Sequence, residues 1–334
     1  MKRILITQLG FIGDVILSTP VIGALRENFP KAELTVLTTV AAAPLIQFHP
    51  AGVSVITYDK RGKEKGLKGF LSMRKTLKSK DFDSVFSLHK SARTTLLHYF
   101  TRIPLRYGFK EAALSFLYSK TVSRKLYPHD VQRNIAILKT IGIEASSPKL
   151  EIGLSEDTIS KTKELIPQSK FVVIAPGSVW KTKRWTAQGF AELSRKLVAE
   201  GFEVVLIGAK DETVLGEIIL QKSGVKVRNY IGELSLVESA AVLSQAAVVV
   251  SNDSSPLHLA STFNVPTVAI FCATVPEFGF GPYQQPSRIM GVDGLKCRPC
   301  GRHGGNICPT GTHACQIGIK VDDIITAVRE LSGI

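Results

Sequence analysis

Three loops of this sequence carry side chains that could bind or transfer a phosphorylated group. The first, Gln8-Leu9-Gly10-Phe11-Ile12-Gly13-Asp14, follows an apolar run. Gly10 and Gly13 permit a tight turn and close approach of a ligand to the backbone. Asp14 stands where a helix should begin, so it is either a helix cap or a general base that takes a proton from a hydroxyl. The third glycine of the dinucleotide-binding fingerprint is missing, which argues against a nicotinamide dehydrogenase.

The second loop is Ala175-Pro176-Gly177-Ser178-Val179-Trp180-Lys181-Thr182-Lys183-Arg184-Trp185. It follows a buried apolar run and precedes a helical pattern. Three cations and two hydroxyls gather around one glycine. Backbone amides, hydroxyls and ammonium groups at a helix start are the groups that bind phosphate or pyrophosphate. A solvated charged loop is the alternative.

The third loop is Ser251-Asn252-Asp253-Ser254-Ser255-Pro256, and a helix containing His258 follows it. The serines and the helix N-terminus can hold phosphate oxygens. Asp253 and Ser254 are equally suited to cap that helix. His258 lies one turn inside the helix, where a buried and hydrogen-bonded histidine is the simpler interpretation.

Short apolar runs alternate with helical patterns along the chain, which predicts parallel α/β sheets with crossover helices. The predicted strands cover residues 3–7, 33–38, 53–58, 84–88, 171–174, 203–207, 247–251 and 267–271. The predicted helices cover residues 15–28, a short stretch from 41, 70–77, 94–100, 131–141, 187–200, 212–220, 236–245, 257–263 and 322–331.

The alternation pauses near residues 145–160, where Ser146-Ser147-Pro148 breaks the pattern. This predicts two Rossmann-like domains, 1–155 and 156–334, the second with a Cys-rich loop (297–315) before its last helix. Ligands of open parallel sheets bind beyond the carboxyl ends of the strands. The cleft between the two sheets is therefore the expected site.

Composition and charge narrow the class of protein. Apolar residues make up 44% and charged residues 21% of 334, which excludes a disordered chain. No apolar run reaches the ~18–20 residues of a membrane span. The apolar N-terminus is broken by Gln8 and Gly10, so we expect a strand rather than a signal peptide, and a cytoplasmic protein.

The charge is divided unequally between the two halves. Residues 1–150 hold 24 basic and 10 acidic residues, whereas residues 151–334 hold 18 of each. A basic half predicts a polyanionic partner: nucleic acid, an anionic membrane surface or a phosphorylated substrate. A solvated basic face is the alternative. The candidate contacts follow the third and fourth strands or lie in the next apolar segment: Lys60, Arg61, Lys63, Lys90, Arg93 and Arg106.

In order and spacing the three loops resemble glycosyltransferase family 9, the heptosyltransferases of the lipopolysaccharide inner core, and most of all its subgroup II. The motifs are Gly13-Asp14-Val15-Ile16 with Pro20, Pro176-Gly177-Ser178 with Lys183 and Trp185, and Asn252-Asp253-Ser254-Ser255 with His258. The resemblance implies a GT-B fold, an ADP-heptose donor, and inversion at the sugar carbon. Ser255 stands where many relatives have Gly.

The resemblance also implies roles for single residues. Asp14 would be the catalytic base, and the basic half would bind a lipid-linked core oligosaccharide. The protein would be a monomer in peripheral contact with the anionic inner face of the inner membrane. The implied donor-binding residues, with Glu212 for the ribose and Leu234 beside the adenine, are Ser178, Lys183, Glu212, Leu234, Asp253, Ser254, Ser255 and His258.

No cofactor or metal is expected, and ADP-heptose is a substrate. The diphosphate can be neutralised by cations and a helix N-terminus, and the one Asp-x-Asp spacing, Asp81-Phe82-Asp83, belongs to a helix–strand connection. Reduced thiols, a metal site and disulfides all stay open for the Cys-rich loop. That cluster comprises Cys297, Cys300, Cys308 and Cys315.

Two rival functions remain. A sugar-nucleotide epimerase can share the two-domain fold, but it would need no lipid-linked acceptor and hence no basic half. A nucleic-acid-binding protein fits the basic half, yet aromatic side chains that would stack on bases are sparse there, and no known binding module is present. We therefore expect no nucleic-acid partner.

Overall fold

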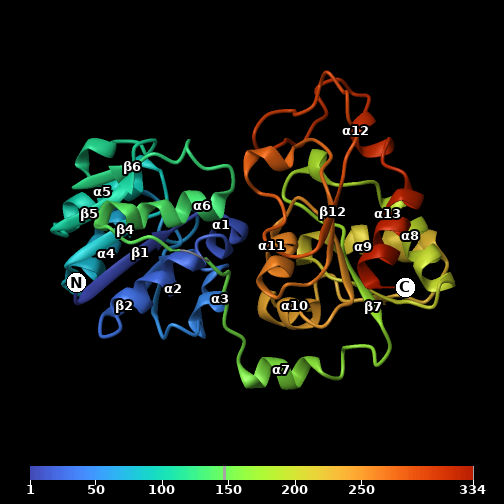
Figure 1. Cartoon of the computed structure of the whole chain (residues 1–334), viewed down its shortest axis with the longest axis horizontal. Helices are drawn as coiled ribbons and strands as arrows, with labels where there is room; N and C mark the ends of the chain where they lie inside the picture. Colours follow the sequence, from blue (N-terminus) through green and yellow to red (C-terminus); the bar gives the residue numbers. More distant parts are fainter. Residues whose placement is uncertain (146–147, 334) are drawn as a thin grey trace. The chain divides into compact units, whose positions relative to one another are not determined.

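The computed structural model describes residues 1–145 and 148–333, and these form two compact units, Met1–Leu154 and Ser155–Ile334 (Figure 1). The predicted break at Ser146-Ser147 lies outside the described residues. Each unit contains a parallel six-stranded sheet within the described part of the chain. The α/β fold class with two Rossmann-like domains is thus confirmed.

The sheet of the first unit has the strand order β3-β2-β1-β4-β5-β6. Its central strand carries Ile4, Leu5 and Ile6, which are buried on both faces as expected for a parallel sheet between helices. The strands are β1 (Arg3–Gln8), β2 (Glu33–Thr38), β3 (Ser54–Thr57), β4 (Ser84–Ser87), β5 (Leu105–Phe109) and β6 (Lys120–Val122).

The helices of this unit mostly match the predicted ranges. The helix predicted over 15–28 is two helices, and Pro20 lies in the first turn of the second, where a missing N–H costs nothing. The pattern at 131–141 is α6 followed by a 3₁₀ segment, Ala136–Ile141. The helices are α1 (Ile12–Ile16), α2 (Thr19–Asn28), α3 (Ala43–Gln47), α4 (Gly66–Lys78), α5 (Ala92–Thr101) and α6 (Asp130–Ile135).

The sheet of the second unit has the order β12-β11-β10-β7-β8-β9. Its core joins valines of β7 and β10 to Trp185, Phe190 and the last helix. The strands are β7 (Phe171–Ala175), β8 (Glu203–Leu206), β9 (Arg228–Asn229), β10 (Val248–Asn252), β11 (Thr267–Ile270) and β12 (Ser287–Met290). The helices are α7 (Glu156–Thr162), α8 (Ala187–Ala199), α9 (Thr213–Ser223), α10 (Leu236–Leu243), α11 (Ser255–Thr262), α12 (Ala314–Ile317) and α13 (Val321–Ser332).

One helix lies where the sequence predicted only a linker. α7 begins inside the stretch 145–160, and the Ser155 hydroxyl caps it by accepting from the Thr158 N–H at 3.1 Å. Its buried positions are Thr158 and Thr162. Because these are polar, the helix has no apolar periodicity that sequence analysis could detect.

Both sheets have the doubly wound strand order, with a switch point where the order reverses. In the first unit this point lies between β1 and β4, and in the second between β7 and β10. Loops that leave the carboxyl ends of these strands are the ones expected to bind ligands. They are the loops that the sequence singled out.

Candidate functional site

An ion pair joins the two loops at the switch point of the second unit. Lys183 Nζ lies 2.6 Å from Asp253 Oδ2, and the Thr274 hydroxyl donates to that same oxygen at 2.7 Å. The Lys183 and Asp253 side chains are only 14% and 7% exposed. The Asp253 carboxylate is thus engaged by protein groups, and it fixes a cation beside the start of α11.

Asn252, the last residue of β10, holds in place the loop that follows β7, residues 176–186, which we call the β7 loop. Its side-chain amide donates to the Pro176 carbonyl at 2.7 Å, and its Oδ1 accepts from the Trp185 N–H at 3.0 Å. Ser254 is the N-cap residue of α11 and Ser255 is its first residue. The β7 loop and the N–H groups that open α11 therefore lie at one edge, beside the Lys183 cation. This is an arrangement that binds phosphate.

The Glu212 carboxylate lies against Gly177 of the same β7 loop. A Cβ on Gly177 would lie 1.8 Å from Glu212 Oε1, so a larger residue there would displace the Glu212 carboxylate from its present position. The Ala209 N–H donates to Glu212 Oε2 at 2.9 Å. Burial raises the pKa of Glu212, although the nearby Arg184 and backbone N–H groups oppose that shift. The structure thus brings Glu212 to the loop that carries Ser178 and Lys183.

The other predicted donor residues lie on the same unit. Ser178 is buried, and its carbonyl accepts from Arg184 Nε at 2.8 Å. His258 is buried within α11. Leu234 is half-buried in the connection from β9 to α10, at the carboxyl end of the strand next to β8.

The Cys-rich loop and the short helix α12 at its end contact the turn Lys181–Lys183, called the Lys183 turn below. Sequence analysis did not predict these contacts. The Thr182 N–H donates to the Gly305 carbonyl at 2.9 Å, and the Gly305 N–H donates to the Thr182 hydroxyl at 2.8 Å. The Gln316 side-chain amide donates to the carbonyls of Lys181, at 3.0 Å, and of Arg184, at 2.5 Å. Because these contacts span more than 120 residues of sequence, no local pattern announces them.

The cysteines are free thiols in the described part of the chain. The Cys300 N–H donates to the Ala273 carbonyl, one residue before Thr274. The Thr310 hydroxyl and the His313 N–H lower the pKa of Cys308 to about 7, whereas burial raises the pKa of Cys315. Within residues 1–145 and 148–333, no group of three or more His, Cys, Asp or Glu side chains is arranged to hold a metal ion.

Asp14 lies at the switch point of the first unit, as the third residue of α1. Its Oδ2 accepts from the Phe11 N–H at 2.8 Å, so the carboxylate caps the helix from inside its first turn. A Cβ on Gly10 would lie 2.5 Å from Oδ2. Gly10 is thus required for this placement, and the side chain is half-buried at the carboxyl end of β1.

Lys60 joins the β1, β3 and β4 loops beside Asp14. Its Nζ donates to the Leu9 carbonyl at 2.8 Å and lies 3.1 Å from His89 Nε2. Burial and the neighbouring Arg61 and Arg93 lower the pKa of Lys60 to about 8, and Asp14 partly opposes this shift. Burial and the adjacent cations lower the pKa of His89 to about 3. A neutral His89 therefore accepts from the Lys60 ammonium.

The other predicted cations divide into two groups. Arg61 lies over the exposed Phe11 ring at 5.2 Å, and Lys63 is exposed on the same loop. Lys90 is half-buried in the loop that follows β4. The structure thus gathers Arg61, Lys63 and Lys90 on the Lys60 and His89 loops.

Arg93 and Arg106 are engaged by the protein itself. Arg93 Nε donates to the Tyr58 hydroxyl at 2.9 Å, and its Nη2 donates to the Gly66 carbonyl at 2.7 Å. Arg106 donates to the carbonyls of Ile103 and Leu117. It is the second residue of β5 and pairs with the start of β4, so it lies toward the amino end of the sheet, away from the other cations.

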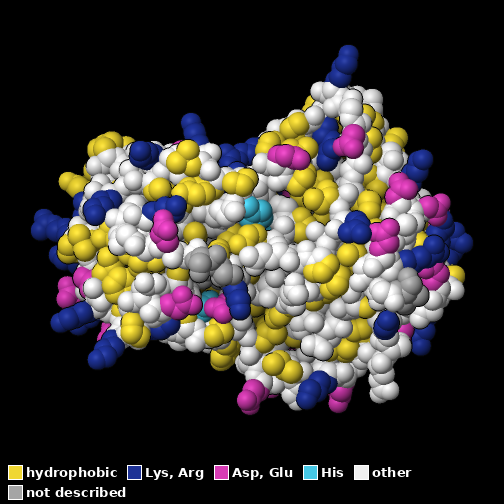
Figure 2. All heavy atoms as spheres, viewed as in Figure 1, with side chains coloured by type: hydrophobic (Ala, Val, Ile, Leu, Met, Phe, Trp, Pro, Cys, Tyr) yellow, Lys and Arg dark blue, Asp and Glu magenta, His cyan; other side chains and the backbone are white. Residues whose placement is uncertain are grey.

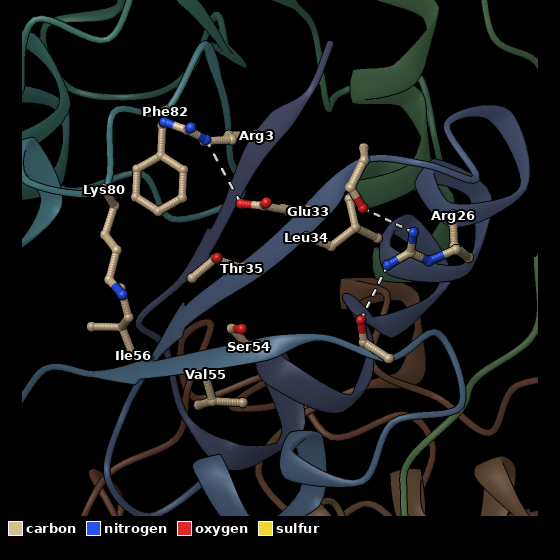
Figure 3. A pocket seen from close by; sticks show the side chains of 12 residues that line it. Arg3, Arg26, Glu33, Leu34, Thr35, Ser54, Val55, Ile56, Lys80 and Phe82 are labelled. Atoms are coloured by element: carbon tan, nitrogen blue, oxygen red, sulfur yellow. Dashed lines mark hydrogen bonds and ion pairs between the residues drawn. The ribbon is translucent and has the colours of Figure 1, made fainter.

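A pocket of about 380 Å³ lies elsewhere on this unit (Figure 3). Its lining includes Arg3, Glu33 and Ser54, the first residues of β1, β2 and β3. It therefore lies at the amino ends of the strands, opposite Asp14. Arg26 in its wall donates to the carbonyls of Ala32 and Gly52. Its position is the wrong edge for a ligand site in this fold.

The sequence model of glycosyltransferase family 9 (heptosyltransferase) matches residues 70–307. The lipopolysaccharide core heptosyltransferase OpsX of Haemophilus influenzae is 26% identical, over 87% of this chain and 84% of that protein. Lipopolysaccharide heptosyltransferase 2 of Escherichia coli is 25% identical, over 86% of this chain and 87% of that protein. These two identities do not separate the subgroups.

The fold of this chain is also similar to that of solved family 9 glycosyltransferases. The crystal structure of the family 9 glycosyl transferase from Veillonella parvula superposes with a TM-score of 0.88 at 23% identity, covering 99% of this chain and 97% of that one. This likeness agrees with the predicted GT-B fold.

Proposed function

This chain belongs to glycosyltransferase family 9, the heptosyltransferases, and we propose that it transfers heptose from ADP-heptose to the inner core of lipopolysaccharide with inversion at the sugar carbon. The observation that carries this proposal is the ion pair of Lys183 with Asp253 beside the start of α11. Such a site suits a diphosphate leaving group.

We assign donor binding to the second unit. Lys183 and the N–H groups that open α11 would neutralise the diphosphate as it leaves. Asp253 acts as a positioning residue for Lys183 rather than as a phosphate ligand, because the negative charges of its carboxylate and of a phosphate repel each other. Glu212 would accept from the ribose hydroxyls, with Leu234 beside the adenine and Ser178, Ser254 and Ser255 near the phosphates.

We assign the catalytic base to Asp14. Its carboxylate would take the proton of the acceptor hydroxyl while that oxygen attacks the anomeric carbon of heptose. The bond from that carbon to the β-phosphate oxygen breaks, and ADP leaves with the electron pair. The bond from the Phe11 N–H fixes the carboxylate in place before substrate binds. Displacement on the face opposite to ADP gives inversion.

We assign acceptor binding to the cations around Lys60 in the first unit: Lys60, Arg61, Lys63 and Lys90. The acceptor would be a lipid-linked, anionic core oligosaccharide at the inner face of the inner membrane, reached by peripheral contact. None of the helices in residues 1–145 and 148–333 is long and apolar enough to cross a bilayer. We propose that the protein works as a monomer, and that neither a metal nor another cofactor is required.

Salt dependence tests the assignment of acceptor to the basic half. Exposed charges are screened over about 8 Å at ~0.15 M salt, and close contacts in a site are screened less. Raising salt to about 0.5 M should therefore raise the KM for acceptor far more than the KM for ADP-heptose. The triple variant Lys60→Gln, Arg61→Gln, Lys63→Gln should copy that effect. Equal salt sensitivity of both substrates would reject the assignment.

A further inference from the structure

The outer face of α4 exposes large apolar side chains although the helix already has a buried face. Met73 and Leu77 anchor α4 in the core of the first unit. Leu67 and Leu71, one turn apart, are nevertheless 72% and 50% exposed. Lys68 and Lys75 are exposed on the same side of the helix as these leucines. The outer face is thus both apolar and basic.

This surface continues onto α5. The Phe70 and Phe100 rings meet edge to face at 6.4 Å, and Tyr99 packs against Phe100 at 5.5 Å. Arg74 Nε donates to the Phe100 carbonyl at 2.8 Å, which holds the two helices together. Tyr99 and Phe100 are 44% and 47% exposed. We call Leu67, Lys68, Leu71, Lys75, Tyr99 and Phe100 together the α4–α5 face.

The two helices carry basic side chains and no acidic ones, although Asp81 and Asp83 lie in the connection between them. Residues 65–80 include six Lys or Arg and no Asp or Glu, and residues 84–110 include five and none. Figure 2 shows hydrophobic and basic side chains, with a few acidic ones among them, over the left part of the surface, where Figure 1 shows α4 and α5. Apolar side chains with interspersed lysines are typical of a helix that lies in the interface of an anionic membrane.

We propose that the α4–α5 face is a docking surface for an anionic phospholipid bilayer. Leu67, Leu71 and Phe100 enter the boundary between headgroups and acyl chains, Tyr99 lies at headgroup level, and Lys68 and Lys75 bind lipid phosphates. The proposal rests on the proposed function, because a lipid-linked acceptor requires the enzyme to work at a membrane.

The structure connects this face to the acceptor loops. Arg93 donates both to the carbonyl of Gly66, the first residue of α4, and to the hydroxyl of Tyr58, two residues before Lys60. The guanidinium thus ties the start of α4 to the Lys60 loop. Docking of α4 on the bilayer would fix the Lys60 loop close to lipid headgroups, where an anchored oligosaccharide begins.

Vesicle binding tests the proposal. Full-length protein is sedimented with vesicles of phosphatidylcholine alone or with added phosphatidylglycerol. Each lysine near an anionic surface contributes about fivefold to binding, so Lys68→Gln with Lys75→Gln should weaken binding about 25-fold on phosphatidylglycerol vesicles. Leu67→Ser with Leu71→Ser should weaken it by about tenfold or more. Val214→Ser and Lys210→Gln, exposed positions of the second unit, are the matched controls.

Heptose-transfer rates on a soluble acceptor and on a vesicle-embedded acceptor test the docking surface separately from the proposed heptosyltransferase activity. On a delipidated soluble acceptor, both double variants should keep the kcat/KM of the wild type. On an acceptor embedded in vesicles, they should lose it in step with vesicle binding. Unchanged vesicle binding in both double variants would overturn the docking surface while leaving heptose transfer intact. A dimer that Leu67→Ser with Leu71→Ser dissociates, with vesicle binding unchanged, would overturn it in favour of an interface between two copies.

A second readout does not depend on those variants folding well. Tyr99→Trp places an indole on the α4–α5 face with little change in size. Its fluorescence should be quenched by brominated phosphatidylglycerol vesicles well beyond the quenching of Trp180 and Trp185 in the wild type. Quenching equal to the wild type would overturn the proposal.

Discussion

Replacing Lys183 by Met should weaken ADP binding by about tenfold to a hundredfold, since charge-assisted contacts contribute about 1.5–3 kcal/mol. The same change leaves the Asp253 carboxylate, only 7% exposed, without its cation. An unpaired buried group costs about 1–3 kcal/mol in the free energy of unfolding. Titration calorimetry with ADP and urea unfolding measure the two effects separately.

Two further variants isolate the cause. Lys181→Met removes an exposed cation two residues earlier on the same turn and should change neither ADP affinity nor stability. The double variant Lys183→Met, Asp253→Asn removes the unpaired carboxylate, so stability should largely return while ADP binding stays weak. If Lys183→Met binds ADP as tightly as Lys181→Met, Lys183 does not bind the diphosphate. If the double variant regains the affinity of the wild type, repulsion by Asp253 explains the loss and the Lys183 cation does not.

Three other predictions concern Asp14, Lys60 and Gln316. Asp14→Asn can still accept from the Phe11 N–H but cannot take a proton, so kcat should fall about 10²–10⁴-fold with ADP affinity unchanged; near-normal turnover would leave Asp14 only a helix cap. The Lys60 pKa is lowered to about 8, so its ammonium is present below that pH and lost above it. Hence kcat/KM for an anionic acceptor should fall from pH 7 to 9, and Lys60→Arg should flatten the profile, whereas identical profiles would exclude Lys60. Gln316→Leu removes both hydrogen bonds to the Lys183 turn and should raise the ADP dissociation constant about threefold to tenfold, with acceptor KM as the control that stays constant.

The central strands and the three loops could be predicted because their signals are local. Each central strand is a buried apolar run, and each loop follows one directly. The edge strands β6 and β9 were missed since they are only three and two residues long and partly exposed. The strand β5 was predicted only as a short apolar segment, so the sequence did not indicate that Arg106 lies near the amino end of the sheet.

Contacts between distant segments could not be predicted from single motifs. The resemblance implied that Asp253 helps to hold the donor, and the structure adds that its carboxylate contacts Lys183 and Thr274 within the protein. Residue types indicate that a loop is polar, and they do not indicate which polar groups satisfy each other. Gln316 could not be predicted for the same reason. It lies next to the Cys-rich loop, and nothing in its local sequence indicates that its side-chain amide contacts the Lys183 turn.

Heptose transfer itself is the activity that most directly tests the proposed function. The direct test incubates the purified protein with ADP-heptose and defined lipopolysaccharide core acceptors that lack one heptose each, and follows the acceptor by mass spectrometry. We expect that one acceptor gains a single heptose residue with inverted anomeric configuration while an equal amount of ADP is released. ADP-heptose that binds but never modifies any core acceptor, or that is only epimerised or hydrolysed, would contradict it.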